Sequence, residues 1–312
     1  MKLLYPKQMI ASLKLCSFTL VFSIATSSNV NATIIISDTF DDGVLGTNTS
    51  GVGNGFSTEN STGVTPLETG GGAVIDHLDS PAGSTGSTFF SNDQFDAASS
   101  ITTTTTFVIS EFGRFDDSIN FTTRQFIGLS DGGAPAGTGV TSFLTNANAG
   151  LFVVLNSDDQ FGATNLPIGG GGVYYTSTDT GPIIELGTFT YDSSLVTVGT
   201  PGSAGRGDRA PVDLLQDLTV TIETDVDGFS VAFSAAGGAT APGTIAGDFS
   251  DFGITNQTTV LDTASAFVAQ QGDGDSRQFI VDSITVEQIP EPTSIALFAL
   301  GGVFGLARRR RA

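Results

Sequence analysis

Three carboxylates at alternate positions, Glu223, Asp225 and Asp227, have the spacing in this sequence that is best suited to catalysis. Two carboxyl groups about 5 Å apart can hydrolyse a glycosidic bond with retention, one as nucleophile and the other as acid and base. Asp227, however, is followed at once by Gly228, which is typical of a hairpin turn rather than of a strand lining a cleft. The chain also has no Trp on which a sugar ring could stack. We therefore expect no enzymatic activity.

The single histidine, His77, is the other candidate for acid–base or metal chemistry. No nucleophile motif accompanies it, and there is no second histidine to complete a zinc site. His77 lies in the strand-like segment Val74-Ile75-Asp76-His77-Leu78, with Asp76 and Asp79 beside it, and we interpret it as a half-buried strand residue.

The chain is strongly acidic, with 32 Asp and Glu against 12 Lys and Arg and a formal net charge of −20. All the lysines lie near the N-terminus and a run of four arginines lies at the C-terminus, so the part between them is more acidic still. Such a charge repels the phosphates of nucleic acid and favours divalent cations as partners. We expect no nucleic-acid binding.

The N-terminal residues 1–32 have the pattern of a secretory signal peptide. Three lysines precede an apolar segment, residues 15–25, and Val30-Asn31-Ala32 then provides small residues for a cleavage site after Ala32. Cys16 lies at the start of the apolar segment rather than after it, so it cannot serve a lipoprotein signal, and it is lost with the leader. The mature chain is predicted to begin at Thr33, to lack disulfides and to be exported through the inner membrane.

The C-terminal residues 289–312 have three parts. The tripeptide Pro290-Glu291-Pro292 interrupts any preceding strand, an uncharged run follows over residues 293–307, and Arg308, Arg309, Arg310 and Arg311 close the chain. Fifteen residues of helix span roughly 22 Å, less than the ~30 Å hydrocarbon core, which favours a temporary stop over a permanent anchor. An ordinary C-terminal membrane anchor is the alternative.

This order of tripeptide, short transmembrane helix and arginine tail resembles the PEP-CTERM sorting signal of bacterial surface proteins. The resemblance implies processing by an exosortase-type enzyme in a Gram-negative bacterium that makes exopolysaccharide. It also implies that the membrane is only a transient partner of the C-terminal helix.

Between the two ends, residues 33–288 are rich in Gly, Thr and Ser and show no helical periodicity. Short alternating or continuous runs of apolar and β-branched residues predict strands instead. The predicted strands are residues 33–37, 73–78, 101–110, 124–129, 150–155, 173–176, 183–191, 218–223, 229–234, 266–269 and 279–287. So many strands without crossover helices predict one all-β domain, an antiparallel β-sandwich.

The clearest hairpin is predicted over residues 217–234, with Gly228 in the left-handed conformation that such turns often require. The Gly-rich stretches at residues 43–72, 132–139 and 199–207 are expected to be surface loops.

The first and last predicted strands resemble those of concanavalin-like jelly rolls, the group that contains laminin-G-like domains, legume-type lectins and family-16 glycoside hydrolases. The segments that carry the resemblance are Ile36-Ser37-Asp38-Thr39-Phe40-Asp41-Asp42-Gly43, residues 279–286 and residues 124–132. The resemblance implies that the two ends of the domain pair side by side. A different antiparallel sandwich remains the alternative.

The same resemblance implies a structural calcium ion between the end strands. Asp38 and Asp282 would be neighbours if those strands pair, and Gly43 would supply a carbonyl oxygen, which suits the hard oxygen ligands that calcium prefers. A second acidic turn lies at Gly272-Asp273-Gly274-Asp275. Solvated Asp-Gly turns without a bound ion are the alternative.

The function expected from these features is that of a non-catalytic cell-surface or extracellular-matrix protein, associated with exopolysaccharide or biofilm. A carbohydrate-binding, lectin-like module is the alternative, because concanavalin-like folds often bind sugars. Tyr174 and Tyr175, which follow a run of glycines, are the candidates for stacking against a glycan, although a place in the core is the favoured interpretation.

Overall fold

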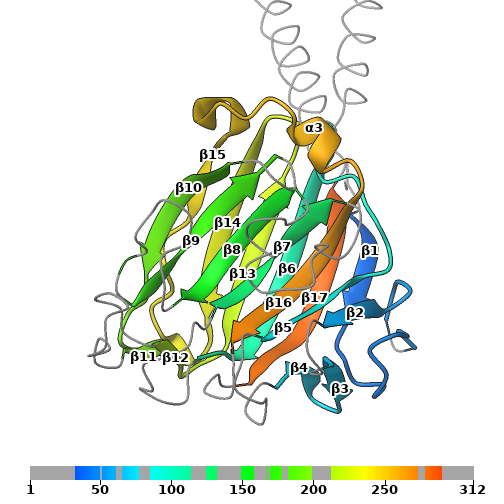
Figure 1. Ribbon diagram of the computed structural model, residues 1–312, viewed down its shortest axis with the longest axis vertical. Coiled ribbons are helices and arrows are strands. Elements are labelled where there is room, and N and C mark those ends of the chain that lie inside the picture. The colour runs from blue at the N-terminus through cyan, green and yellow to red at the C-terminus, as the bar shows by residue number, and fades with distance from the viewer. Residues whose placement is uncertain are drawn as a thin grey trace, which may run out of the picture. The chain divides into compact units, whose positions relative to one another are not determined.

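The computed structural model describes residues 32–49, 51–60, 65–76, 85–113, 124–131, 149–157, 167, 169–177, 182–198, 212–272 and 278–289. These residues form two large β-sheets that pack face to face in one compact unit, Thr33–Gln288 (Figure 1). The strand pairs described within both sheets are antiparallel. The predicted all-β antiparallel sandwich is confirmed.

The first sheet has eight strands in the order β15-β14-β13-β6-β17-β4-β3, with β1 also paired to β17. Its strands are β1 (Thr33–Asp38), β3 (Leu67–Thr69), β4 (Gly72–Ile75), β6 (Thr102–Glu111), β13 (Leu218–Thr224), β14 (Gly228–Ala235), β15 (Ile245–Asp248) and β17 (Phe279–Ile289).

The second sheet has seven strands in the order β10-β9-β8-β7-β16-β5-β2. Its strands are β2 (Phe56–Asn60), β5 (Thr85–Ser91), β7 (Arg124–Asp131), β8 (Gly150–Ser157), β9 (Gly170–Thr176), β10 (Ile183–Thr190) and β16 (Ala264–Gly272).

The remaining described elements are short. They are the small two-stranded sheet of β11 (Val196–Val198) and β12 (Val212–Leu214), the 3-10 turns η1 (Ala236–Gly238) and η2 (Phe249–Phe252), and the helix α3 (Gln257–Val260). None of the helices described is long and apolar enough to cross a membrane. The predicted signal peptide before Ala32 and the predicted transmembrane helix after Ile289 lie outside the described residues.

The two ends of the domain pair, as the sequence predicted. Strand β1 runs antiparallel to β17, with Thr33 opposite Gln288 and Asp38 opposite Ile284. The first strand therefore takes part of its backbone hydrogen bonding from the last, and Ser37 also exchanges backbone hydrogen bonds with Val52.

In the first sheet, alternate side chains of a strand face the core and the surface, as β6 shows. Along β6 the buried positions include Phe107 and Ile109, and the residues between them are half-buried. Successive side chains of a strand point to opposite faces, so one face of β6 packs into the core and the other faces outward.

The middle strands of the seven-stranded sheet, β7, β8, β9 and β16, are buried on both faces. The inner face of the sheet contributes Ile127, Leu129 and Val153 to the main core. Alternate positions on the same strands form a second cluster, made by Phe126, Phe152, Val154, Tyr174, Phe267 and Ala269. Burial on both faces explains why β8 and β9 read as nearly continuous apolar and glycine runs rather than as alternating ones.

The hairpin of β13 and β14 is confirmed, but the predicted role of Gly228 was wrong. Gly228 is not among the glycines with positive φ. The side chain of Asp225 holds the turn instead, because its Oδ1 accepts hydrogen bonds from the backbone N–H groups of Asp227 and Gly228, each at 2.8 Å. A Cβ on residue 228 would lie 2.9 Å from the carbonyl oxygen of Gly247 in β15, so glycine permits close strand packing here.

The prediction of a continuous surface loop over residues 43–72 was also wrong, because this stretch contains β2 and β3. Strands β5 and β15 were missed as well. These strands are short or rich in Gly, Ser and Thr, so local pattern gives little sign of them. The predicted loops at residues 132–139 and 199–207 lie outside the described residues.

Candidate functional site

The candidate site is an acidic cluster at the end of β1, where Asp38 is the last residue of the strand. Asp38 pairs with Ile284, a fully buried core residue, so its side chain lies on the core-facing side of the sheet. Only 3% of Asp38 is exposed. A carboxylate at this depth needs partners for its oxygens.

One oxygen of Asp38 is bound by the loop that follows the strand. Its Oδ1 accepts a hydrogen bond of 2.8 Å from the backbone N–H of Phe40, which has the unusual φ of +49°. The ring of Phe40 is buried against Phe56 and Phe89, with ring centroids 5.3 and 5.9 Å away. This aromatic anchor holds the loop against the core beneath the carboxylate.

A second carboxylate, Glu68 of β3, reaches the same loop. Glu68 pairs with Ala73, a core residue, so it too lies on the core-facing side, and it is 9% exposed. Its Oε1 accepts a hydrogen bond of 2.6 Å from the backbone N–H of Gly43, whose φ of +81° favours glycine. Asp38 and Glu68 therefore bind opposite ends of residues 40–43.

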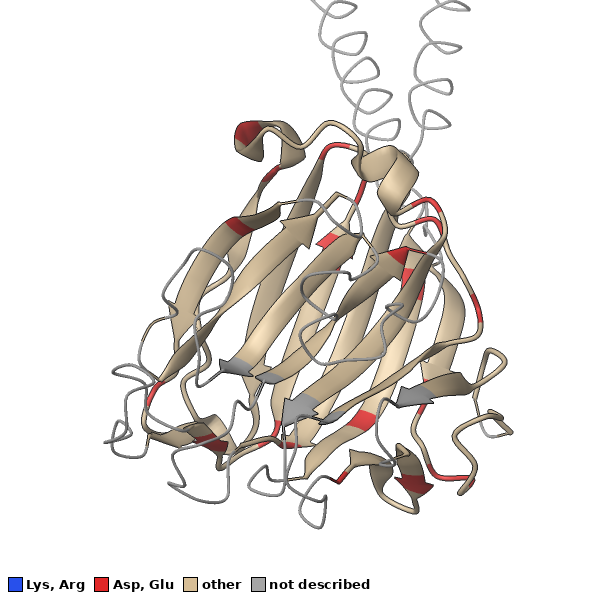
Figure 2. Ribbon diagram, in the orientation of Figure 1, with Lys and Arg blue, Asp and Glu red and all other residues tan. Residues whose placement is uncertain are grey.

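Oδ2 of Asp38 is buried without a hydrogen-bond partner, whereas the side chain of Glu68 interacts with that of Asp42 and lowers the pKa of Asp42. Burial raises the pKa of the Asp38 and Glu68 carboxyls, backbone N–H donors oppose that rise, and the negative charge of nearby Asp42 adds to it. No residue whose side chain the structure describes is Lys or Arg, and acidic residues are spread over strand ends and loops (Figure 2). The cluster thus brings acidic side chains together without a described Lys or Arg beside them.

Asp42 is the third acid of the cluster and has satisfied oxygens. Its Oδ2 accepts hydrogen bonds from the N–H and hydroxyl of Thr49 at 2.7 and 2.8 Å, and its Oδ1 accepts one from Val44 N–H at 3.0 Å. These donors lower the pKa of Asp42, so it is ionised at neutral pH.

The structure does not bring Asp282 to this site, which corrects the ligand set expected from the sequence. Asp282 follows Val281, a core residue, and accepts a hydrogen bond of 2.6 Å from the hydroxyl of Ser110. Ser110 in turn follows the core residue Ile109, so Asp282 and Ser110 share the outer face of the sheet. Asp38 lies on the inner face, and the sheet separates the two carboxylates.

Glu68 is the functional candidate that the sequence reasoning missed. It lies in a three-residue strand inside a stretch predicted to be a loop, and nothing in its neighbours marks it as buried. Only the pairing of β3 with β4 places it on the core side.

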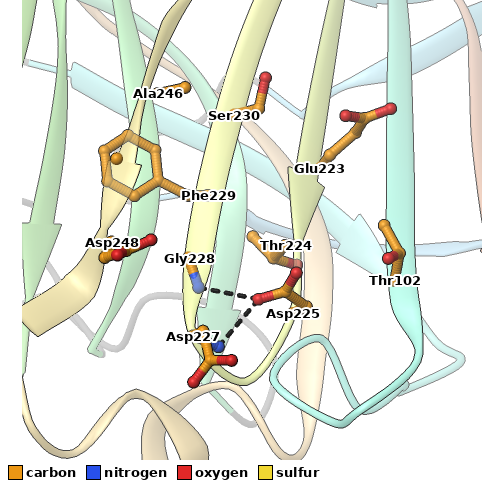
Figure 3. Close-up of a pocket in the computed structure, with 11 residues that line it drawn as sticks. Thr102, Glu223, Thr224, Asp225, Asp227, Gly228, Phe229, Ser230, Ala246 and Asp248 are labelled. Carbon is orange, nitrogen blue, oxygen red and sulfur yellow. Dashed lines mark hydrogen bonds between the residues drawn. The ribbon is translucent and has the colours of Figure 1, made fainter. Parts of the chain in front are cut away.

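A second candidate site is a hollow of about 390 Å³ at the end of β13, β14 and β15 (Figure 3). Figure 3 shows Glu223 and Asp248 on opposite sides of Ser230, over the turn that holds Asp225. The alternating carboxylates thus border a hollow, which the sequence had not predicted. Asp225 is engaged in the hairpin turn, because its Oδ1 accepts the backbone hydrogen bonds of Asp227 and Gly228 (Figure 3).

The two candidate glycan-stacking tyrosines are fully buried. Tyr174 stacks on Phe152 in the second cluster, with ring centroids 6.0 Å apart. Tyr175 lies in the main core, donates a hydrogen bond of 3.3 Å to Asn256, and has a pKa raised by burial. Neither ring presents a face to solvent, which fits the place in the core that the sequence also allowed.

Other residues considered from the sequence are His77, the acids at 273 and 275, and the sorting residues from Pro290 to Arg311, and they lie outside the described residues. Within the described part of the chain, no three His, Cys, Asp or Glu side chains are grouped as a metal site.

Comparison with known protein families bears on the C-terminus. Residues 288–311 match the family model for the PEP-CTERM protein-sorting motif. The chain ends in a PEP-CTERM sorting motif. The motif overlaps the last two residues of β17, so the sorting motif begins where the sandwich ends. No curated protein matches the chain.

Solved structures with a similar arrangement of strands include several lectins. Lectin II from Ulex europaeus has 10% identity and a TM-score of 0.48, over 82% of this chain and 99% of the lectin. Peanut lectin has 14% identity and a TM-score of 0.48, over 83% and 97% of the two chains. The exoplasmic/lumenal domain of VIP36 in its Ca²⁺/Man2-bound form has 12% identity and a TM-score of 0.45, over 81% and 87%.

Proposed function

We propose that the protein is exported through the inner membrane of a Gram-negative bacterium, and that its β-sandwich acts at the cell surface or in the exopolysaccharide matrix as a non-catalytic protein. The observation that carries the proposal is the sorting motif at residues 288–311. An exosortase-type enzyme processes the motif while the apolar segment is held transiently in the membrane.

The position of the motif supports this order of events. Strand β17 ends at Ile289, and Pro290-Glu291-Pro292 follows at once. Proline cannot donate a backbone hydrogen bond, so the tripeptide does not extend the sheet. Cleavage beyond Ile289 leaves the pairing of β1 with β17 complete, and the sandwich is released intact.

The geometry at the β13–β14 turn supports a non-catalytic role. Glu223 lies in a strand and Asp227 in the turn after it, whereas retaining hydrolysis needs two carboxyls that converge on one glycosidic bond. Asp225, between them, holds the turn through two backbone hydrogen bonds.

The proposal is tested by changing Pro290, Glu291 and Pro292 to alanine in a producing strain that has an exosortase. We expect the altered protein to remain in the inner-membrane fraction at its unprocessed C-terminal length, while the wild type is processed and leaves that fraction. In a strain without the exosortase, the wild-type protein should also remain unprocessed in the inner-membrane fraction. Normal processing and release of the variant would refute the proposed role of the tripeptide.

Carbohydrate binding is the second candidate function, and the hollow at Glu223 and Asp248 favours it. Its rim combines carboxylates with the hydroxyl of Ser230, groups that can accept and donate hydrogen bonds to sugar hydroxyls. A glycan array should show binding that is lost in Asp248→Ala and kept in Asp262→Ala, an exposed acid outside the hollow. Equal binding by both variants would remove the hollow as the glycan site.

A further inference from the structure

We propose that the hollow at β13, β14 and β15 binds a polysaccharide with free amino groups, and that the sugar chain continues from the hollow over the hydroxyl side chains of β6 and β13. This use of the hollow rests on the carbohydrate-binding function proposed above, and it adds the class of sugar and the course of the sugar chain.

The strand register places the hollow on the outer face of the first sheet. Glu223 pairs with Ser230, Ser230 pairs with Ala246, and all three residues line the hollow. Paired residues of neighbouring strands point to the same side of a sheet. Ile222, which precedes Glu223, is fully buried in the core, so the hollow opens on the face that points away from the core.

A surface of short hydroxyl side chains continues from the hollow along β6 and β13. Thr221 lies two residues before Glu223 and therefore on the same face, and it pairs with Thr106, with 3.5 Å between their hydroxyl oxygens. Thr104 pairs with Glu223 itself. Threonine is stiff at χ1, so these side chains lose little freedom when a ligand binds. The face thus offers rigid donors and acceptors to an extended chain of sugars.

Two hydroxyl groups at this place have no hydrogen-bond partner within the described part of the protein. They are those of Thr104 and Thr224, whose Oγ1 atoms are buried. Thr224 is 2% exposed and lines the hollow. Buried hydroxyls are nearly always hydrogen-bonded in folded proteins. Unused hydrogen-bonding groups beside the hollow are therefore an independent sign of a polar ligand.

The carboxylates of the hollow determine the charge of that ligand. Among the described residues that line the hollow, four are Asp or Glu and none is Lys or Arg. Glu223 and Asp248 lie on opposite sides of Ser230 and are exposed (Figure 3). Neither has a hydrogen-bond or ion-pair partner among the described residues. The hollow therefore repels sugar acids and attracts protonated amino groups.

The separation of these two carboxylates favours a polymer. Glu223 lies on β13 and Asp248 on β15, with β14 between them. Neighbouring strands are about 4.8 Å apart, so roughly 10 Å separates the backbones that carry the two carboxylates. This spacing suits two amino groups of one sugar chain better than a single small cation.

Binding is measured by titration calorimetry on the exported protein, purified as it is produced. The probes are a hexamer of β-1,4-linked glucosamine, which has free amino groups, and the hexamer of N-acetylglucosamine, which has none. We expect the glucosamine hexamer to bind about tenfold more tightly at low salt, and sodium chloride to reduce this preference. The glucosamine disaccharide should bind more weakly than the hexamer, because it does not reach the hydroxyl surface.

The variants Glu223→Gln and Asp248→Asn keep the shape of each side chain and remove its charge. Each should weaken binding of the glucosamine hexamer about threefold, as expected for one exposed ion pair, and leave binding of the acetylated hexamer unchanged. Thr221→Val should weaken binding of both hexamers, because it removes a hydroxyl from the face. Asp262→Asn, which changes an exposed acid outside the hollow, should leave both affinities unchanged. Equal melting temperatures will show that the variants are folded.

The possible outcomes separate this inference from the function on which it rests. Equal affinity for the two hexamers, or a preference for amino groups that persists when Glu223 and Asp248 are both replaced, overturns the inference and leaves carbohydrate binding standing. Binding of neither hexamer, with no binding on the glycan array, overturns both. Equally tight binding of spermine, together with no effect of Thr221→Val, would show a site for any polycation and would overturn the assignment to sugars.

Discussion

Replacement of Phe89 by alanine tests the packing that supports the acidic cluster. Phe89 is fully buried in β5, and its ring lies 5.9 Å from that of Phe40 and 5.7 Å from that of Phe56. Truncation of a buried Phe to Ala costs about 3–5 kcal/mol, from lost transfer free energy and a residual cavity. For a domain of this size each kcal/mol lowers the melting temperature by about 2–4 °C. We therefore expect Phe89→Ala to lower it by about 6–20 °C.

Phe90 provides the matched control, because it is the next residue of the same strand and points to the opposite face. Phe90 is only half-buried and packs against the second cluster. Its removal should cost roughly half as much, about 2 kcal/mol, in proportion to the smaller area it buries. Urea unfolding of both variants, followed by circular dichroism, measures the two free energies. An equal or larger loss in Phe90→Ala would refute the register of β5 described here, because a one-residue slip exchanges the two faces.

Two further predictions concern single positions. Burial raises the pKa of Asp282 above its ordinary value, although the hydrogen bond from the Ser110 hydroxyl opposes the rise. The folded state therefore holds this proton more tightly than the unfolded state, so the domain loses stability as the pH rises from the ordinary Asp pKa to the raised one. Asp282→Asn should therefore raise the melting temperature at pH 7 and lose this advantage at low pH, and an advantage that is constant with pH would contradict this. Gly228→Ala should destabilise the domain by about 1–3 kcal/mol, because its Cβ would lie 2.9 Å from the Gly247 carbonyl oxygen. Gly243→Ala, where a Cβ meets nothing within 4 Å, should change the free energy of unfolding little, and similar effects in both variants would contradict the close approach.

Sequence pattern predicted the fold class because local alternation and turn residues agree with the final pairing in several places. The hairpin of β13 and β14 shows this best, since Val220 and Ile222 alternate with polar residues and Asp225 begins the turn. Pairing of the two chain ends came from a resemblance rather than from pattern, and β1 and β17 confirm it.

The face on which Asp282 lies could not be predicted from the sequence. Counting from Phe279 and Val281, which are buried, places Asp282 outside, whereas counting back from Ile284 and Val286 places it inside. The alternation of β17 changes phase between residues 281 and 284, and strict period-two reasoning fails at such an irregularity.

The position of Glu68 shows a second limit of the sequence. Whether a carboxylate in a three-residue strand is buried depends on the strands that pair around it, β4 next in the chain and β17 near its other end. The core side of β3 is set by its pairing to β4 and by that of β4 to β17, and this information is absent from residues 67–69.

The central claim is tested most directly by the mass of the mature protein. Intact-mass measurement and terminal peptide mapping of cell-associated and released protein, from a host with an exosortase, should show a chain that starts at Thr33 and lacks residues 308–311. Mature protein that keeps Arg308 to Arg311 in such a host would contradict the account.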